Sequence, residues 1–327
     1  MTASTANLTH RTGLGDTAAG MSMLHRGIFI ALLALLLVAP FQFYPVFLMK
    51  VLCFALFASA FNLLLGYGGL LSFGHAAYFG AASYISAHAA KVWGLTPELA
   101  ILSGTAVAAV LGLVFGSLAI RRHGIYFAMV TLAFAQMVYF FALQAPFTGG
   151  EDGIQAVPRG DLFGIISLRP DINLYYLVLA IFFLGILAIY RIIHSPFGQV
   201  LKAIRDNEPR AISLGYAVNR YKLMVFTMSA ALAGLAGATK AIVFQLASLT
   251  DVYWTMSGEV VLMTLLGGMG TVFGPMVGAF IVVTMQNYLA HMGDWVTVIQ
   301  GVIFVVAVMM FRKGIVGVIG HWLKRSL

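Results

Sequence analysis

Charged residues are the first thing that this sequence lacks. Lys and Arg together number 19 and Asp and Glu 11 among 327 residues, so 9% of the chain is charged while 61% is hydrophobic. A soluble domain is about a quarter charged and about half apolar, and a water-soluble fold of this size could not cover its surface with so few charges. The composition therefore excludes a soluble enzyme, a disordered chain and a nucleic-acid-binding protein, and it indicates a polytopic membrane protein.

Cysteine and catalytic motifs are also scarce. The single cysteine, Cys53, lies in an apolar run, cannot form an intrachain disulfide and is interpreted as a packing residue. The sequence has no Gly-x-x-x-x-Gly-Lys-Ser/Thr phosphate loop, no Ser-His-Asp set or metal cluster in its apolar segments, and no Thr-Val-Gly-Tyr-Gly filter. Chains of intramembrane acidic residues, which proton-coupled carriers use, are missing too. We therefore predict no catalytic residue, no metal site and no cofactor in this chain, and transport driven from outside it.

Long apolar runs are what the sequence has instead. Only α-helices and closed barrels satisfy the backbone in lipid, and these runs are continuous and longer than the alternating strands of about ten residues that form barrels. We predict an all-α, polytopic transmembrane helical bundle of about ten helices, with eight as the lower alternative. Because a crossing needs about 20 residues, the eighth segment is expected to be a half-helix or an irregular buried segment. The predicted spans are 27–46, 47–65, 70–90, 98–120, 124–145, 173–192, 221–245, 256–267, 272–290 and 295–311.

The distribution of charge predicts that both chain ends are cytoplasmic. With the N-terminus inside, most Lys and Arg residues fall in inside segments and most Asp and Glu residues fall outside, as the positive-inside rule requires. An odd number of helices would place the Arg312-Lys313 and Lys324-Arg325 pairs outside, so nine and eleven helices are rejected. The basic residues left outside are Lys50, Lys91, Arg159 and Arg169.

Polar segments divide the chain around this membrane domain. Residues 1–26 are predicted to be a polar, disordered cytoplasmic tail, residues 27–315 the transmembrane domain, and residues 316–327 a basic cytoplasmic tail. A cleaved signal peptide is the alternative for the run over 28–39, but the apolar pattern resumes directly after it. Two loops stand out: 146–172 on the periplasmic side and 193–220 on the cytoplasmic side.

The segment 193–220 reads as a pair of short amphipathic helices. Ser195 is a good N-cap and Pro196 suits the first helical position. Pro209 ends or restarts the helix, and Gly215 closes the second turn as a C-terminal cap. The apolar face of the pair either rests on lipid headgroups or forms a ridge that inserts into a groove on a partner protein.

Glycine clusters interrupt the helices at two places. The stretches 66–69 and 267–270 each break an apolar run, and each is followed by Phe-Gly, so the two hairpins look like a degenerate internal repeat. Close helix packing explains such glycines, while broken helices at a repeat interface are also typical of a translocation path. Both interpretations stay open.

Polar side chains inside the predicted spans are few. Ser72 and His75 lie in the third span, where His75 either makes an interhelical hydrogen bond or belongs to a pathway or gate. A metal site is not expected there, because no second ligand lies three or four residues away. Lys240 either extends to the outer surface or pairs with Glu259 or Asp251 near the outer mouth.

Four motifs in order give the sequence a family resemblance that covers about residues 40–315. Residues 62–81, 148–154, 195–215 and 265–275 resemble the corresponding segments of the branched-chain amino acid permeases of ABC importers, the LivM-type inner-membrane subunit. The sequence departs from the importer consensus Glu-Ala-Ala…Gly, since Pro209-Arg210-Ala211 occupies the equivalent positions. The exact partner contacts are therefore left open.

The resemblance implies roles for two sets of residues. In that family the cytoplasmic loop is the coupling helix that docks on the ATPase. Here the implied coupling residues are Pro196, Gly198, Lys202, Ala203, Arg205, Asn207, Glu208, Ala211 and Gly215. The possible pathway or gate residues are Ser72, Gly74, His75, Lys240, Glu259, Gly267, Gly268 and Gly270.

The resemblance also implies a function and partners. We expect the permease subunit of an ATP-driven importer for branched-chain amino acids in the bacterial inner membrane, working by alternating access. The expected partners are a second related permease, two ABC ATPase subunits that bind the ATP and Mg, and a periplasmic substrate-binding protein. The alternatives are a urea or short-amide importer, an ATP-independent channel or secondary carrier, and a membrane scaffold without transport.

Overall fold

The computed structural model describes residues 23–289, 295–310 and 314–322. The chain divides into two units, residues 1–39 and 40–327. In the first unit the described part is the apolar helix α1, Met23–Val38. Most of the predicted N-terminal tail, the Arg312-Lys313 pair and residues 323–327 lie outside the described residues, although α1 already begins within the predicted tail.

The second unit is mostly helical. Every predicted span from the second to the tenth contains one long helix, and three further helices, α7, α8 and α13, follow elsewhere. In chain order the helices are α2 Pro45–Asn62, α3 His75–Lys91, α4 Pro97–Ala119, α5 Ile125–Gln144, α6 Asp171–His194, α7 Pro196–Asp206, α8 Glu208–Ser213, α9 Val218–Phe244, α10 Trp254–Gly267, α11 Gly274–Leu289, α12 Trp295–Met310 and α13 Ile315–Trp322.

Among the described residues, five helical segments are long and apolar enough to cross a bilayer. They are Pro45–Tyr67, Pro97–Ala119, Ile125–Gln144, Asp171–His194 and Val218–Phe244, which makes the chain a multi-pass membrane protein. The helices α1, α3, α10, α11 and α12 have 14 to 17 residues each. Ten complete crossings, eight as the alternative, and cytoplasmic chain ends stay predictions.

Three expected boundaries are corrected. The first two spans were divided after residue 46, but α1 ends at Val38 and Pro45 opens α2, because proline suits the first turn of a helix. The third helix begins at His75 rather than at residue 70, since residues 68–74 are not helical. Part of the predicted C-terminal tail forms α13.

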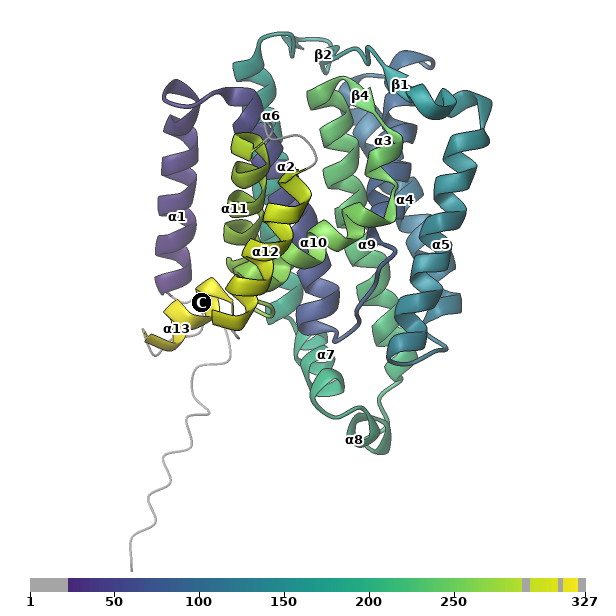
Figure 1. Cartoon of the computed structure of the whole chain (residues 1–327), viewed down its shortest axis with the longest axis vertical. Coiled ribbons are helices and arrows are strands. Elements are labelled where there is room, and N and C mark those ends of the chain that lie inside the picture. The colour runs from purple at the N-terminus through teal and green to yellow at the C-terminus, as the bar shows by residue number, and fades with distance from the viewer. Residues whose placement is uncertain (1–22, 290–294, 311–313, 323–327) are drawn as a thin grey trace, which may run out of the picture. The chain divides into compact units, whose positions relative to one another are not determined.

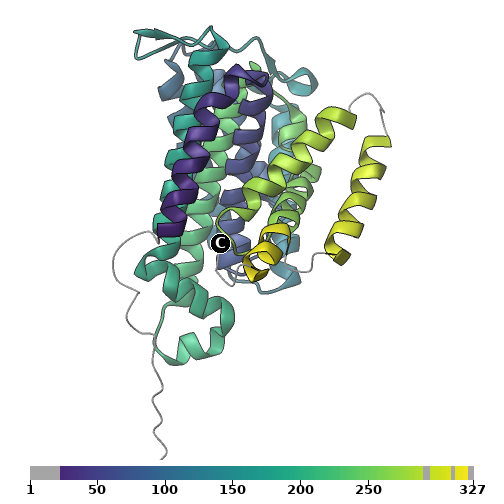
Figure 2. The same cartoon turned by 90° about the vertical axis from the view of Figure 1, so that its left-hand side faces the viewer.

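Helices α2, α3, α4 and α9 form the densely packed centre of the second unit (Figures 1 and 2). Small residues bring them close: a Cβ on Gly234 would collide with the Ala108 side chain, and one on Gly104 would lie 3.0 Å from the Ala238 Cβ. In the most apolar stretch of α2, 89% is buried, against 28% for α5. The α2 helix is therefore central, and α5 is peripheral.

Four short strands are the exception to the all-α prediction. β1 (Ile154–Gln155) pairs antiparallel with β4 (Leu246–Ala247), and β2 (Asp161–Leu162) pairs with β3 (Ile166–Ser167). All four belong to the loops after α5 and α9, at the end of the second unit opposite α7 and α8 (Figure 1). We call these the loop end and the α7–α8 end.

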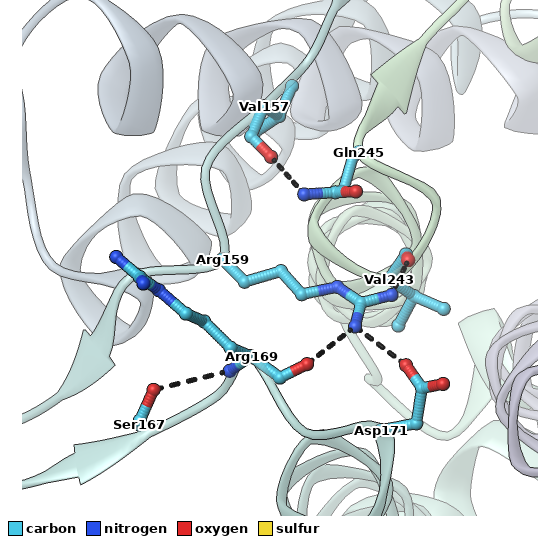
Figure 3. A network of polar contacts seen from close by, with 7 residues as sticks. All are labelled: Val157, Arg159, Ser167, Arg169, Asp171, Val243 and Gln245. Atoms are coloured by element: carbon cyan, nitrogen blue, oxygen red, sulfur yellow. Dashed lines mark hydrogen bonds and ion pairs between the residues drawn. The ribbon is translucent and has the colours of Figure 1, made fainter.

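Arg159 fixes the 146–172 loop to the neighbouring helices (Figure 3). Its Nη1 donates to Asp171 Oδ1 at 2.6 Å and to the Arg169 carbonyl at 3.2 Å, and its Nη2 donates to the Val243 carbonyl at 3.3 Å. Gln245, just after α9, donates from Nε2 to the Val157 carbonyl and accepts from the Val157 amide, both at 3.1 Å. These bonds join the loop to the start of α6 and to the end of α9.

Candidate functional site

The helix pair α7–α8 is formed by the caps that the sequence predicts. Ser195 Oγ accepts from the Gly198 amide at 3.3 Å, and Pro196 occupies the first turn of α7. Asn207 caps α8 by accepting from the Arg210 amide at 3.0 Å. Gly215 follows α8 with φ of 86°, and the Tyr216 amide donates to the Ala211 carbonyl at 3.2 Å, which completes a glycine C-cap.

The pair is held to the membrane helices by its inner side. Ile204 of α7, Ala211 of α8 and Val218 of α9 form a buried cluster. Beside it, Lys222 Nζ of α9 donates to Glu208 Oε1 at 2.7 Å. Glu208 is therefore engaged inside this chain.

The exposed side of the pair carries two large apolar side chains among polar ones. Ile212 and Leu214 are 58% and 69% exposed. A groove of about 480 Å³ runs next to them, lined by Phe197, Tyr216, Tyr221 and neighbouring residues of α7 and α9. Exposed apolar side chains at the tip of a projecting helix pair suit either predicted role, resting on lipid headgroups or docking on a partner protein.

The two glycine breaks lie against each other next to α7. We use the name glycine junction for the turns 66–70 and 267–271, which follow α2 and α10. Asn62 joins them, because its Nδ2 donates to the Thr271 carbonyl at 2.8 Å and its Oδ1 accepts from the Gly270 amide at 2.9 Å. A Cβ on Gly66 would lie 2.6 Å from the Gly270 amide nitrogen, so the two backbones can touch because residue 66 is glycine.

Arg205 of α7 reaches the glycine junction. Its Nη1 donates to the Gly66 carbonyl, and its Nη2 lies 3.1 Å from Asp206 Oδ1. The neighbouring Lys202 Nζ lies 5.6 Å from the centre of the Tyr67 ring. Burial, and then the positive charge of Arg205, lower the pKa of Lys202. Both cations of α7 thus contact the chain's own π-helical turn η2, Leu63–Tyr67.

The predicted gate residues of the third span lie at the start of α3. Ser72 Oγ accepts from the Gly74 amide at 3.2 Å, and Gly74 packs against Thr131 of α5. His75 Nε2 lies 2.8 Å from Ser229 Oγ, which donates to the Ala60 carbonyl at 2.6 Å. Because the serine hydrogen is used there, the network assigns the hydrogen of His75 to Nε2.

His75 therefore makes the interhelical hydrogen bond that was one of its two interpretations. Its ring lies fully buried among the rings of Phe61, Tyr78 and Phe226. A gate role for Ser72, Gly74 and His75 stays a prediction.

The glycines of the second break allow neighbouring backbone segments to pack closely. A Cβ on Gly267 would collide with the Gly274 carbonyl, and Gly268 lies against Gly274 and Gly314. Gly270 has φ of 78°, in the left-handed region that favours glycine. These contacts support the packing interpretation, and the pathway role of these glycines stays a prediction.

Lys240 and Asp251 form a buried ion pair at the loop end. Lys240 Nζ donates to the two Asp251 carboxylate oxygens at 2.8 and 2.6 Å, and Asp251 is 2% exposed. This confirms one of the two predicted pairings. Glu259 interacts with Gln286 and Lys50 instead.

An apolar cavity of about 400 Å³ lies between α3, α4 and α5. Its walls include Ile85, Leu111, Phe115, Val138 and Phe141, with the Tyr84 and Thr148 side chains at its edge. Sequence reasoning did not single out these residues, since apolar side chains on membrane helices carry no distinguishing pattern. Within the described ranges, no group of three or more His, Cys, Asp or Glu is placed to hold a metal ion.

The coupling residues chosen from the sequence fall into two groups. Gly198, Lys202, Arg205, Glu208 and Ala211 make contacts within the chain. Pro196, Ala203, Asn207 and Gly215 are exposed, although Asn207 also caps α8. The exposed apolar tip, Ile212 and Leu214, was not among the choices, although its apolar residues beside Arg210 and Ser213 were a readable signal.

Comparison with known proteins decides the family. The model of the family described as "Branched-chain amino acid transport system / permease component" matches residues 45–308. The chain belongs to this family of permease components. The match covers the glycine junction, the α7–α8 pair and the loop end, and the resemblance deduced from the motifs is confirmed.

The sequence identity to individual relatives is low, at 27% to 30%. The chain is 27% identical to the high-affinity branched-chain amino acid transport system permease protein LivM of Escherichia coli K12 over 276 residues, 77% of this chain and 63% of that protein. It is 29% identical to the ribose import permease protein RbsC of Bacillus subtilis over 55% of this chain and 58% of that protein. For the xylose transport system permease protein XylH of Escherichia coli K12 the identity is 30%, over 51% and 45%. No solved structure matches the chain.

Proposed function

We propose that this chain is the membrane permease subunit of an ATP-driven importer for aliphatic, branched-chain amino acids in a bacterial inner membrane. Family membership supports the permease role. The observation that carries the proposal is the α7–α8 pair, which is fixed to the membrane helices on one side and presents Ile212 and Leu214 on the other. This is the arrangement that a chain without its own phosphate loop needs in order to receive a push from ATPase subunits.

The mechanism is alternating access. ATP binding brings two ATPase subunits together, their movement displaces α7–α8, and the helices of this chain and of a second, related permease rock to open the path to either side. A periplasmic binding protein delivers the substrate at the loop end. There, the Arg159 contacts and the β1–β4 pair hold the 146–172 loop in place.

Aliphatic substrates suit the chemistry of the cavity. The walls between α3, α4 and α5 are apolar and offer few hydrogen-bond partners. These walls can contact an aliphatic side chain, whereas the charged ammonium and carboxylate groups of an amino acid, like the hydroxyl groups of a sugar, need polar partners outside them. The name of the LivM relative points to the same substrate class.

A sugar importer is the second candidate, because relatives named for ribose and xylose import match about half of the chain. Urea or short amides are a third. Uptake of labelled leucine by the reconstituted importer, challenged with unlabelled isoleucine, ribose, xylose or urea, separates them. We expect competition by isoleucine alone.

The docking surface is tested by the double variant Ile212→Asp, Leu214→Asp. Two carboxylates in place of two exposed apolar side chains should reduce co-purification of the ATPase subunits by at least about tenfold, since each lost apolar contact is worth about 1.5–3 kcal/mol. The control is Phe163→Asp, which alters a 72% exposed aromatic residue at the loop end and should leave ATPase binding unchanged.

Two results would contradict the proposal. One is unchanged ATPase binding in the double variant. The other is accumulation of leucine in vesicles that contain the permeases without ATPase subunits, which would indicate a secondary carrier instead.

A further inference from the structure

Arg205 lies between the two regions that an importer of this kind has to connect. Its backbone belongs to α7, the helix beside the exposed tip of α8, while its guanidinium group lies at the glycine junction. Its Cγ lies 2.8 Å from where a Cβ on Gly69 would be, and its Nη1 lies 3.7 Å from the corresponding position on Gly270. One side chain therefore bonds to the first glycine break and lies beside the second.

The Gly66 carbonyl is available to Arg205 because of how α2 ends. The last carbonyl groups of a helix have no intrahelical partner and need another donor. The Leu65 carbonyl accepts from the Gly69 amide at 3.1 Å, and the Leu64 carbonyl accepts from the Leu70 amide at 3.2 Å. The guanidinium group meets the need of the Gly66 carbonyl, so α7 closes the end of α2.

Asn62 makes the two breaks a single mechanical unit. Its side-chain amide donates to the Thr271 carbonyl and accepts from the Gly270 backbone amide, and the residue is 2% exposed. Because Gly66 and Gly270 are in direct backbone contact, a displacement of one turn is passed to the other. Whatever moves Arg205 thus moves the ends of both α2 and α10.

We propose that Arg205 is a positioning residue that transmits the movement of α7 and α8 to both glycine breaks at once, and that it is not a contact to the ATPase. This inference rests on the proposed function. It assigns two tasks to one loop: the α8 tip binds the ATPase subunit, and α7 passes the displacement to the glycine junction. Lysine cannot replace arginine here, because the fork of the guanidinium group satisfies the Gly66 carbonyl and Asp206 together.

The test uses a cysteine reporter in the assembled complex. Cys53 is the only cysteine in the sequence and is 2% exposed, so the wild-type chain should react little with maleimides. Met269 lies in the second break and is 51% exposed, which makes Met269→Cys a suitable reporter. Its maleimide reaction rate is measured in lipid nanodiscs with the ATPase subunits bound, without nucleotide and after trapping with ATP and vanadate.

We expect the rate to change at least about fivefold on trapping when Arg205 is present, in the usual range for coupled sites. Arg205→Gln should abolish the change while the ATPase subunits still co-purify. Arg210→Gln, the same substitution at an exposed position of α8, should keep the change. Arg205→Lys retains the charge and the stem, serves if the glutamine variant does not assemble, and should also lose the change.

Three results would overturn the inference. They are a nucleotide response that survives Arg205→Gln, no response in the Arg205 parent, and loss of ATPase binding in an Arg205→Gln permease that is still folded, which would make Arg205 a docking residue. Failure of the proposed function shows elsewhere, in the Ile212 and Leu214 double variant, where Arg205 is intact.

Discussion

The two ends of the second unit use arginine in different ways. At the loop end, the Arg159 side chain is 16% exposed and bonds to Asp171 and two carbonyl groups, next to a paired strand and the buried Lys240–Asp251 pair. At the α7–α8 end, the Arg205 side chain is 39% exposed and bonds to one carbonyl group and its exposed neighbour Asp206. Arg159 is therefore a largely buried side chain that fastens its loop, whereas Arg205 is more exposed and makes fewer bonds to other segments.

This difference matches two mechanical needs. A surface that receives a delivered substrate has to keep its shape, and buried charge pairs strongly penalise structures that separate them. A segment that transmits a push has to move without unfolding. Exposed ion pairs such as Arg205–Asp206 contribute about 0–1 kcal/mol, so breaking one opposes the displacement of α7 only weakly.

The largest effect on stability is expected at Lys240 and Asp251. Replacing Asp251 with Asn leaves the buried Lys240 ammonium without its counter-charge, and should cost about 3–5 kcal/mol of the free energy of unfolding. Thermal unfolding in nanodiscs measures the loss. The matched control is Asp206→Asn, which removes the exposed partner of Arg205 and should cost about 0–1 kcal/mol.

A double variant sharpens this test. Lys240→Leu together with Asp251→Leu removes both charges, and should recover most of the stability lost in the single variant. Equal losses in Asp251→Asn and Asp206→Asn would remove the contrast between the two ends.

A smaller effect is expected from Arg159→Gln. The variant loses the bonds to Asp171, Arg169 and Val243, and we expect the local free energy of opening of the 146–172 loop to fall by about 1–2 kcal/mol. Hydrogen exchange of residues 154–171 should then be roughly tenfold faster. Arg169→Gln is the control, since the exposed Arg169 side chain points away from Asp171 in Figure 3. Equal exchange in both variants would show that Arg159 does not hold the loop.

Local features of this molecule could be predicted from the sequence. The caps at Ser195 and Gly215 were readable because capping depends on residues within one turn. The Lys240–Asp251 pair was within reach for a similar reason, because Asp251 lies only 11 residues after Lys240, in the turn that follows α9. The helical segments followed from hydropathy, apart from the short non-helical stretches before Pro45 and His75.

Contacts between distant segments could not be predicted. Asn62 and Thr271 are 209 residues apart, and Arg205 and Gly66 are 139 apart, so no periodicity or spacing joins them. For the same reason the bonds of Arg205 and Glu208 within the chain could not be foreseen, and the coupling role that the resemblance implies for them stays a prediction. The glycine breaks were visible, but their meeting at one junction was not.

The most direct test of the account is the side of the membrane on which each end lies. Leu214→Cys places a thiol on the α8 tip and Phe163→Cys places one at the loop end, at positions that are 69% and 72% exposed. In right-side-out vesicles, a membrane-impermeant maleimide should label the cysteine at 163 and spare the one at 214, and in inverted vesicles the pattern should reverse. Labelling of the cysteine at 214 from outside would contradict a drive that enters through α7 and α8.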